Sequence, residues 1–164
     1  MNNFKETQLN SNILKAISEM GFKTPTPIQA KTIPHLMNSN QDLIATAQTG
    51  TGKTAAFGLP SIHLTDLKYN DTQTLVLCPT RELCIQIAKD LAKYSKFVAG
   101  INILAVYGGS DIKTQIRSLN RGAHIVIGTP GRTKDLIKRK KLNISRITRI
   151  ILDEADEMLT MGFK

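Results

Sequence analysis

Short apolar runs alternate with helical patterns along most of the chain, and this alternation most constrains the fold. The apolar runs lie at about 42–47, 74–78, 101–107, 123–128 and 147–152. Helical patterns fill the gaps; the clearest places its apolar residues at Leu83, Cys84, Ile87, Ala88, Leu91 and Tyr94. Continuous apolar strands separated by amphipathic helices are typical of a parallel sheet that is covered on both faces. We therefore expect an α/β fold with a doubly wound, mostly parallel sheet, which binds ligands beyond the carboxyl ends of its strands.

The first forty residues have a different organisation, with two helical segments and no strand pattern. Apolar residues from Leu9 to Met20 recur at helical spacing, with Asn10 or Ser11 as the cap and Gly21 as the stop. Two prolines then precede a second short helix, expected over roughly 28–38. We expect residues 1–40 to form an N-terminal helical region and residues 41–164 to form the α/β domain.

The net charge of +9 and the isoelectric point near 9.7 suggest a polyanionic partner, and nucleic acid is the first candidate. The alternative is that the lysine excess only keeps the protein soluble. With no Trp and 5% aromatic residues, recognition by base stacking is disfavoured. Contacts to a nucleic acid should therefore fall mostly on its phosphates and sugars.

Cysteine and histidine usage does not predict a metal site. Cys78 and Cys84 are too few and wrongly spaced for zinc, so we expect buried free thiols. His35, His63 and His124 are scattered and receive no role. The polar N-terminus does not resemble a signal peptide and no apolar run reaches membrane-spanning length, so we expect a cytoplasmic protein without a membrane partner.

The junction between the run 42–47 and Gln48-Thr-Gly-Thr-Gly-Lys-Thr54 predicts a phosphate-binding loop. Gly50 and Gly52 permit a tight turn with inward N–H groups, Lys53 adds a positive charge, and Thr54 offers a hydroxyl to Mg²⁺. Ala47 stands where the usual pattern has its first glycine. Taken alone, this segment could be an ordinary turn rich in Gly and Thr.

A second segment strengthens the prediction. Arg149-Ile-Ile-Leu-Asp-Glu-Ala-Asp156 ends a buried strand in acidic residues, where a nucleotide-hydrolysing site needs a metal ligand and a base. An acidic helix N-cap is the alternative for this segment alone. The two segments together favour nucleoside triphosphate binding.

Six motifs, in order, make the chain resemble the first RecA-like domain of a DEAD-box RNA helicase. The resemblance extends from Phe4 to Phe163 and depends on Gly21-Phe-Lys-Thr-Pro-Thr-Pro-Ile-Gln29, Ala47-Gln-Thr-Gly-Thr-Gly-Lys-Thr54, Pro79-Thr-Arg-Glu-Leu83, Gly108-Gly109, Thr129-Pro-Gly-Arg132 and Asp153-Glu-Ala-Asp156. The resemblance implies an RNA-dependent ATPase that uses ATP and Mg²⁺, with single-stranded or short duplex RNA and a second RecA-like domain as partners. Ala47 is normal in this family.

The resemblance assigns the ATP-site residues. Gln29 would hydrogen-bond the adenine edge, Phe22 would stack on the base, Phe4 would support that pocket, and Thr24 would line it. On its own, Gln29 could be a polar residue at a helix start. The phosphates would be held by Thr49, Gly50, Thr51, Gly52 and Lys53. Thr54 and Asp153 would hold Mg²⁺, with Asp153 acting through water, and Glu154 would deprotonate the attacking water. Asp156 would couple to later motifs.

The resemblance also assigns the RNA contacts, namely Pro79, Thr80, Arg81, Gly108, Gly109, Thr129, Gly131 and Arg132. Without it, Arg81 could equally be a helix-start residue, and the two glycines a plain turn. The Lys- and Arg-rich stretch from Arg132 to Arg149 includes Lys140 and Lys141, for which a solvated face is the better interpretation.

The family's Ser-Ala-Thr motif and second RecA-like domain lie outside this sequence. We therefore expect the chain alone to bind nucleotide weakly and to hydrolyse it slowly or not at all, since an arginine finger from that domain is worth about 10³–10⁵ in rate. In the family, the Ser-Ala-Thr strand separates the phosphate-loop strand from the Asp153 strand. Without it we expect a swapped or oligomeric arrangement, or a local departure from the family fold at the C-terminal end.

Three functions remain open at this stage. The leading one is the ATP- and RNA-binding half of a helicase that separates short RNA duplexes. An RNA clamp or scaffold would use the same site without unwinding. An ordinary P-loop kinase or transporter ATPase is disfavoured, because it has no need of the Gln29, Arg81 and Thr129 motifs.

Overall fold

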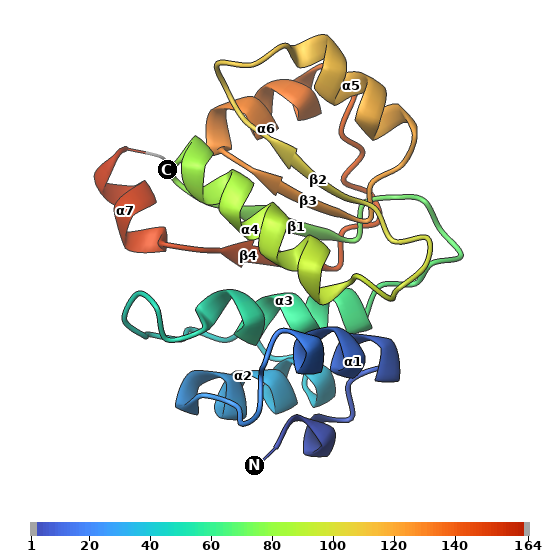
Figure 1. Cartoon of the computed structure of the whole chain (residues 1–164). Helices are drawn as coiled ribbons and strands as arrows, with labels where there is room; N and C mark the ends of the chain where they lie inside the picture. Colours follow the sequence, from blue (N-terminus) through green and yellow to red (C-terminus); the bar gives the residue numbers. More distant parts are fainter. Residues whose placement is uncertain (1–2, 163–164) are drawn as a thin grey trace. The chain divides into compact units, whose positions relative to one another are not determined.

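The computed structural model describes residues 3–162 and divides into two compact units. Unit 1 consists of Met1–Leu64 and Asp90–Ala99, and unit 2 of Thr65–Lys89 and Gly100–Lys164. The phosphate loop therefore shares a unit with the N-terminal helices, whereas the acidic motif belongs to the unit that holds the sheet (Figure 1).

Unit 1 is helical. It contains η1 (Phe4–Thr7), α1 (Ser11–Glu19), α2 (Pro27–Asn38), α3 (Lys53–His63) and the end of α4 (Arg81–Tyr94). Asn10 caps α1 by accepting a 2.8 Å hydrogen bond from the Asn12 N–H, and Gly21 follows this helix at φ +82°. Both N-terminal helices expected from the sequence are present.

The core of unit 1 lies between these helices. Ile13 and Ile17 of α1, Ile33 of α2, Leu59 of α3 and Leu91 of α4 are all at most 1% exposed. Burying an aliphatic side chain of this size contributes about 1.5–3 kcal/mol, so these five residues contribute much of the stability of unit 1, to which α3 belongs. The position of α3 matters because this helix begins at the phosphate loop.

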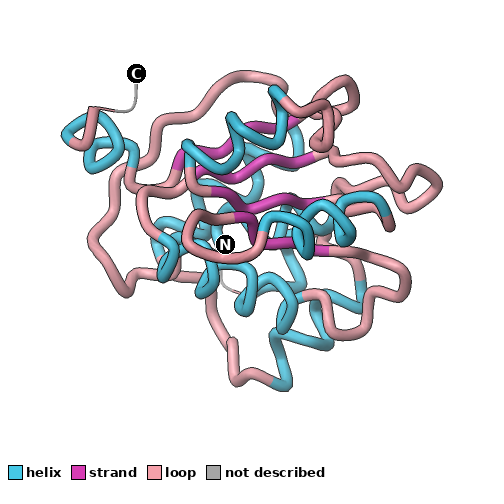
Figure 2. Tube along the Cα trace, turned by 90° about the horizontal axis from the view of Figure 1, so that it is seen from above, coloured by secondary structure: helices cyan, strands magenta, loops and turns pink. Residues whose placement is uncertain are grey.

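Unit 2 contains a four-stranded sheet of β1 (Thr74–Leu77), β2 (Ile103–Val106), β3 (Ile125–Gly128) and β4 (Arg149–Leu152). The order is β2-β3-β1-β4, and every neighbouring pair is parallel. The helices α5 (Ile112–Asn120) and α6 (Pro130–Lys138) connect strands, and α7 (Ala155–Thr160) follows β4 (Figure 2). The expected parallel α/β architecture is confirmed.

Helices cover both faces of this sheet. On one face, Leu75, Val106 and Val126 share a core with Leu119 of α5 and Leu136 of α6. Because side chains alternate along a strand, residues such as Val76 and Ile127 point to the opposite face, and both are fully buried. There the first half of α4 contacts the sheet, since the Cys84 Sγ donates to the Ile127 carbonyl at 3.1 Å.

One expected strand is absent. Residues 42–47 form no strand, and Leu43 and Ile44 are 41% and 94% exposed. A strand needs a neighbour that satisfies its backbone, and among residues 3–162 no strand pairs with this segment. The apolar run therefore stays extended and uncovered, and the sequence-based assignment of a strand here was wrong.

The sheet ends at β4, which pairs with β1 and exposes 65% of Ile150 and 56% of Leu152. Within the described residues there is thus no open slot in the middle of the sheet. The departure from the expected strand pattern lies at 42–47 rather than at the C-terminal end, where β4 and α7 form normally. A swapped or oligomeric arrangement stays a prediction.

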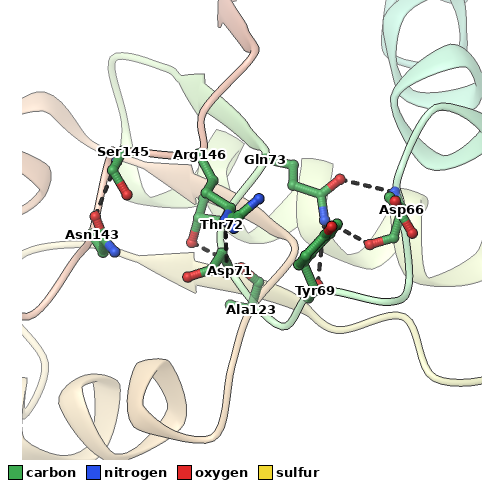
Figure 3. A network of polar contacts seen from close by, with 9 residues as sticks. All are labelled: Asp66, Tyr69, Asp71, Thr72, Gln73, Ala123, Asn143, Ser145 and Arg146. Atoms are coloured by element: carbon green, nitrogen blue, oxygen red, sulfur yellow. Dashed lines mark hydrogen bonds and ion pairs between the residues drawn. The ribbon is translucent and has the colours of Figure 1, made fainter.

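A network of polar contacts lies at the amino ends of the strands (Figure 3). The Gln73 amide donates to the Asp66 carbonyl at 2.8 Å and to the Tyr69 carbonyl at 3.3 Å, and accepts from the Asp66 N–H at 2.8 Å. The Thr72 hydroxyl donates to the Ala123 carbonyl at 2.8 Å. These bonds fix the loop that leads into β1.

No helix among residues 3–162 has the length and apolarity needed to cross a membrane.

Candidate functional site

The phosphate loop leads directly into the start of α3. Gly50 and Gly52 have φ values of +79° and +86°, which only glycine adopts without strain, and Lys53 is the first helical residue. No described side chain caps this helix, so its first N–H groups are left for a ligand. An uncapped helix start that carries a lysine and follows two glycines fits the phosphates of a nucleotide.

Gln29 connects α2 to this loop. Its side chain is 3% exposed; the Nε2 atom donates to the Gly52 carbonyl at 3.1 Å, and the Oε1 atom accepts from the Thr26 N–H at 3.0 Å. A Cβ atom at Gly52 would collide with the Gln29 amide. Each polar atom of Gln29 thus makes one bond within unit 1, so an adenine edge could be met by the second Nε2 hydrogen and the second lone pair of Oε1.

An aromatic cluster lies in the same unit. The rings of Phe4 and Phe22 are 5.9 Å apart between centroids, and Phe22 meets Tyr94 edge-on at 6.0 Å. Burial, aided by the charge of Asp90, raises the pKa of Tyr94 to about 12, so its phenol stays neutral. Phe22 is only half-buried and keeps part of its ring accessible, whereas Thr24 is exposed.

The acidic motif follows the carboxyl end of β4. The Asp153 N–H donates to the Leu77 carbonyl at 2.9 Å, which continues the pairing with β1 by one residue. Glu154 then adopts φ +54° and ψ +48° and occupies the N-cap position of α7, where its side chain makes no capping bond. A left-handed conformation at a residue other than glycine is uncommon and occurs preferentially at functional sites. It places Glu154 at the turn between strand and helix.

A thiol lies beside these carboxylates. A hydrogen bond with Cys84, burial, and then the charges of Cys84, Asp153 and Glu154 raise the pKa of the Cys78 thiol. Cys78 and Cys84 are both fully buried and free, as expected from the sequence. The carboxylates therefore have a neutral, protonated thiol next to them.

The two residues expected to hold Mg²⁺ come from different units, Thr54 from unit 1 and Asp153 from unit 2. Within residues 3–162, no group of three or more His, Cys, Asp or Glu side chains could hold a metal ion. A magnesium ion held by either residue would take most of its oxygen ligands from phosphates and water, as Mg²⁺ commonly does in nucleotide sites.

Two of the expected RNA-contacting segments meet in unit 2. Arg81, the first residue of α4, lies with its guanidinium carbon 5.0 Å from the centre of the Tyr107 ring. Gly109 has φ +75°, and a Cβ atom there would lie 3.7 Å from the Arg81 Nη1. Thr80 accepts from the Leu83 N–H at 3.2 Å and so caps the helix that Arg81 begins.

The Thr129–Arg132 segment joins the same cluster. Thr129 is the N-cap of α6 without a described side chain bonded there, and Gly131 is exposed. The Arg132 guanidinium, however, donates to the Gln115 Oε1 at 2.9 Å and to the Ser110 carbonyl at 3.1 Å. Arg132 thus lies where expected, but two of its donors are used within the protein.

The sequence motifs do not include three residues whose contacts hold this cluster together, namely Tyr107, Ser110 and Gln115. A signal for Gln115 exists in the sequence: it falls in the apolar stripe of α5, between Ile112, Ile116 and Leu119. A polar residue in a buried stripe has to find partners inside the fold. No comparable pattern marks Tyr107 or Ser110.

Comparisons with known proteins agree with this geometry. The sequence model described as DEAD/DEAH box helicase matches residues 26–164. The ATP-dependent RNA helicase CshA of Listeria monocytogenes is 54% identical over 163 residues, which cover 99% of this chain and 31% of that protein. The ATP-dependent RNA helicase DeaD of Mycobacterium tuberculosis is 48% identical over 160 residues, which cover 98% of this chain and 28% of that protein.

A crystal structure of a DEAD box protein from the hyperthermophile Methanococcus jannaschii superimposes with a TM-score of 0.94 and 45% sequence identity, over 99% of this chain and 44% of that one. The chain therefore belongs to the DEAD/DEAH box helicase family. Its fold is that of the RecA-like domain of such a protein. It spans about a third of the length of the curated relatives that it matches.

Proposed function

We propose that this chain is the ATP- and RNA-binding first half of an ATP-dependent RNA helicase, which couples ATP hydrolysis to local separation of RNA duplexes. The observation that carries the proposal is the uncapped start of α3, at Lys53, joined by the Gly52 carbonyl to the buried Gln29 amide. One connected element thus offers a phosphate site and a base-reading amide. The two relatives described above are named as RNA helicases, which supports the same conclusion.

In this proposal, residues 49–53 hold the phosphates of ATP. The adenine pocket is formed by Phe22 with Phe4 behind it, by Gln29, and by Thr24 at its rim. Gln29 suits adenine because an amide donates and accepts at once. The bonds that Gln29 makes to Thr26 and to Gly52 would orient its amide, and the bond to Gly52 would connect the bound base to the phosphate loop.

Thr54 and Asp153 are the residues that would hold Mg²⁺, Asp153 through water. When bound, the ion supplies positive charge to the phosphate oxygens. Glu154, held at the strand-to-helix turn next to Asp153, is the base that takes a proton from the attacking water. The proposal requires unit 1 and unit 2 to act on the same nucleotide.

The RNA strand, in this proposal, contacts the cluster around Arg81, Gly108 and Gly109, and the start of α6 at Thr129 and Gly131. Pro79 and Thr80 shape the start of α4. Exposed backbone and an arginine suit phosphate and sugar rather than base edges, in keeping with binding that ignores sequence. A second RecA-like domain of the natural protein would close over both sites. We also propose a cytoplasmic location. An RNA clamp would use the same contacts, and no observation favours it.

Nucleotide titration of the chain tests the ATP site. Lys53→Ala should abolish measurable ATP binding, because it removes the charge at the helix start that faces the phosphates. Lys31→Ala, which removes an exposed lysine from α2 in the same unit, is the matched control and should leave affinity unchanged. Equal affinity in the two variants would refute the placement of the phosphate loop.

A further inference from the structure

A buried amide on α5 organises the loop that follows β2. Gln115 is 7% exposed, and its Nε2 atom donates to the Tyr107 carbonyl at 3.1 Å and to the Ser110 hydroxyl at 2.6 Å. Its Oε1 atom accepts from Arg132 at 2.9 Å. One side chain thus binds both ends of the loop 107–110 and the arginine of α6.

Arg132 completes a closed ring of bonds. It donates through Nη2 to the Ser110 carbonyl at 3.1 Å, while Ser110 and Arg132 are each bonded to Gln115. Hydrogen bonds that involve a charged group and are shielded from water are among the stronger ones. Removing the Gln115 amide would leave the Tyr107 carbonyl and one arm of the guanidinium without these partners.

The loop held in this way carries the groups expected to meet RNA. It contains Gly108 and Gly109, and the Tyr107 ring lies against the Arg81 guanidinium. Gly109 depends on a left-handed conformation, φ +75°, and the loop is exposed at both glycines. A short glycine loop gains ordering only from its surroundings, because glycine itself imposes little on the backbone.

We propose that Gln115 is a positioning residue for RNA binding: it sets the loop 107–110, and through Tyr107 also Arg81, in the binding arrangement before RNA arrives. Arg132 helps to hold the same loop through its bonds to Gln115 and to the Ser110 carbonyl. This inference depends on the proposed RNA-binding function. The competing explanation is that Gln115 is a buried amide that contributes to stability alone.

The two explanations differ in which kinetic constant changes. In the natural full-length protein, Gln115→Ala should raise the RNA concentration for half-maximal ATPase stimulation about ten-fold, since a free loop loses affinity when it must be ordered on binding. The turnover at saturating RNA and the KM for ATP should stay at the wild-type values. Gln115→Glu, which keeps an acceptor for Arg132 but loses both donor bonds, should fall between. Asn120→Ala, an exposed change on the same helix, is the control.

A second measurement needs no RNA. The backbone NMR order parameters of residues 108–110 of the chain should fall from about 0.85 in Asn120→Ala to about 0.6 or below in Gln115→Ala, while those of β1 and β3 stay equal. Unchanged order parameters in the loop would overturn the inference whatever RNA does. A fall in turnover that leaves both half-saturation values unchanged would indicate a loss of folded protein alone and would also overturn the inference. A wild-type protein that does not respond to RNA would refute the proposed function instead.

Discussion

The two ends of the sheet in unit 2 differ in what their polar contacts hold together. At the amino ends of the strands, polar groups bond to one another, and Gln73 makes three bonds to Asp66 and Tyr69 (Figure 3). In addition, Arg149 donates to the Thr74 hydroxyl at 3.0 Å. This end is suited to holding the sheet together.

At the carboxyl ends, the chain leaves the strands in less common backbone conformations, and the bonds of Gln115 there hold a loop rather than the strands. Glu154 is left-handed, Gly109 is left-handed and exposed, and the start of α6 at Thr129 has no described side-chain cap. These features cost stability unless something else compensates, and they coincide with the residues expected to bind ligands. We therefore propose that the bonds at the amino ends mainly stabilise the sheet, whereas the carboxyl ends carry the residues that bind ligands.

The largest effect should come from Glu154→Gln at the carboxyl end. In the natural full-length protein this change should lower RNA-stimulated ATP hydrolysis by about 10²–10⁴-fold, because the amide cannot accept the proton from water. ATP binding and the midpoint of thermal unfolding should stay close to wild type. Glu157→Gln, an exposed change on α7, is the control. Wild-type hydrolysis by Glu154→Gln would remove its assignment as the base.

At the amino end, Gln73→Ala should act on stability. The side chain is 7% exposed and its loss leaves two carbonyls and one N–H near Asp66 without their partner, which costs about 1–3 kcal/mol in the free energy of unfolding. Denaturant unfolding of the chain measures this, with the exposed Lys68→Ala as the control. A change in RNA affinity larger than the change in stability would break the proposed division between the two ends.

The smallest effect should come from Arg146→Ala at the same end. Arg146 lies 3.5 Å from an Asp71 carboxylate oxygen and 4.2 Å above the Tyr69 ring, and it is exposed. Pairs of this kind contribute about 0.5–1 kcal/mol. We expect the loss to shrink further in high salt, as measured by unfolding at two ionic strengths. A loss that does not depend on salt would assign the effect to the ring contact alone.

Much of the fold could be predicted from the sequence because the strands of unit 2 are continuous apolar runs between amphipathic helices. The same reasoning failed at residues 42–47. Apolar character indicates that the side chains of a segment favour burial, but it does not show whether a neighbouring strand is present to pair with its backbone. Ile44, exposed by 94%, is the result.

The candidate site shows a similar limit. The motifs pointed to Arg81, Gly109 and Arg132, and the structure brings these three into one cluster in unit 2. Motif reasoning supplies residue types, yet it does not reveal that Arg132 uses two donors, and Gln29 one, within the protein. Such internal bonds join residues that are far apart in the sequence, for example Gln115 and Arg132, which are separated by 17 positions.

The central claim is that one nucleotide is held jointly by the phosphate loop of unit 1 and the carboxylates of unit 2. Its most direct test replaces Mg²⁺ by paramagnetic Mn²⁺ in the presence of a non-hydrolysable ATP analogue and follows the amide NMR signals of the chain. The account predicts strong broadening both at residues 50–54 and at residues 153–154, with no broadening when the analogue is omitted. Broadening at only one of these two segments would contradict it.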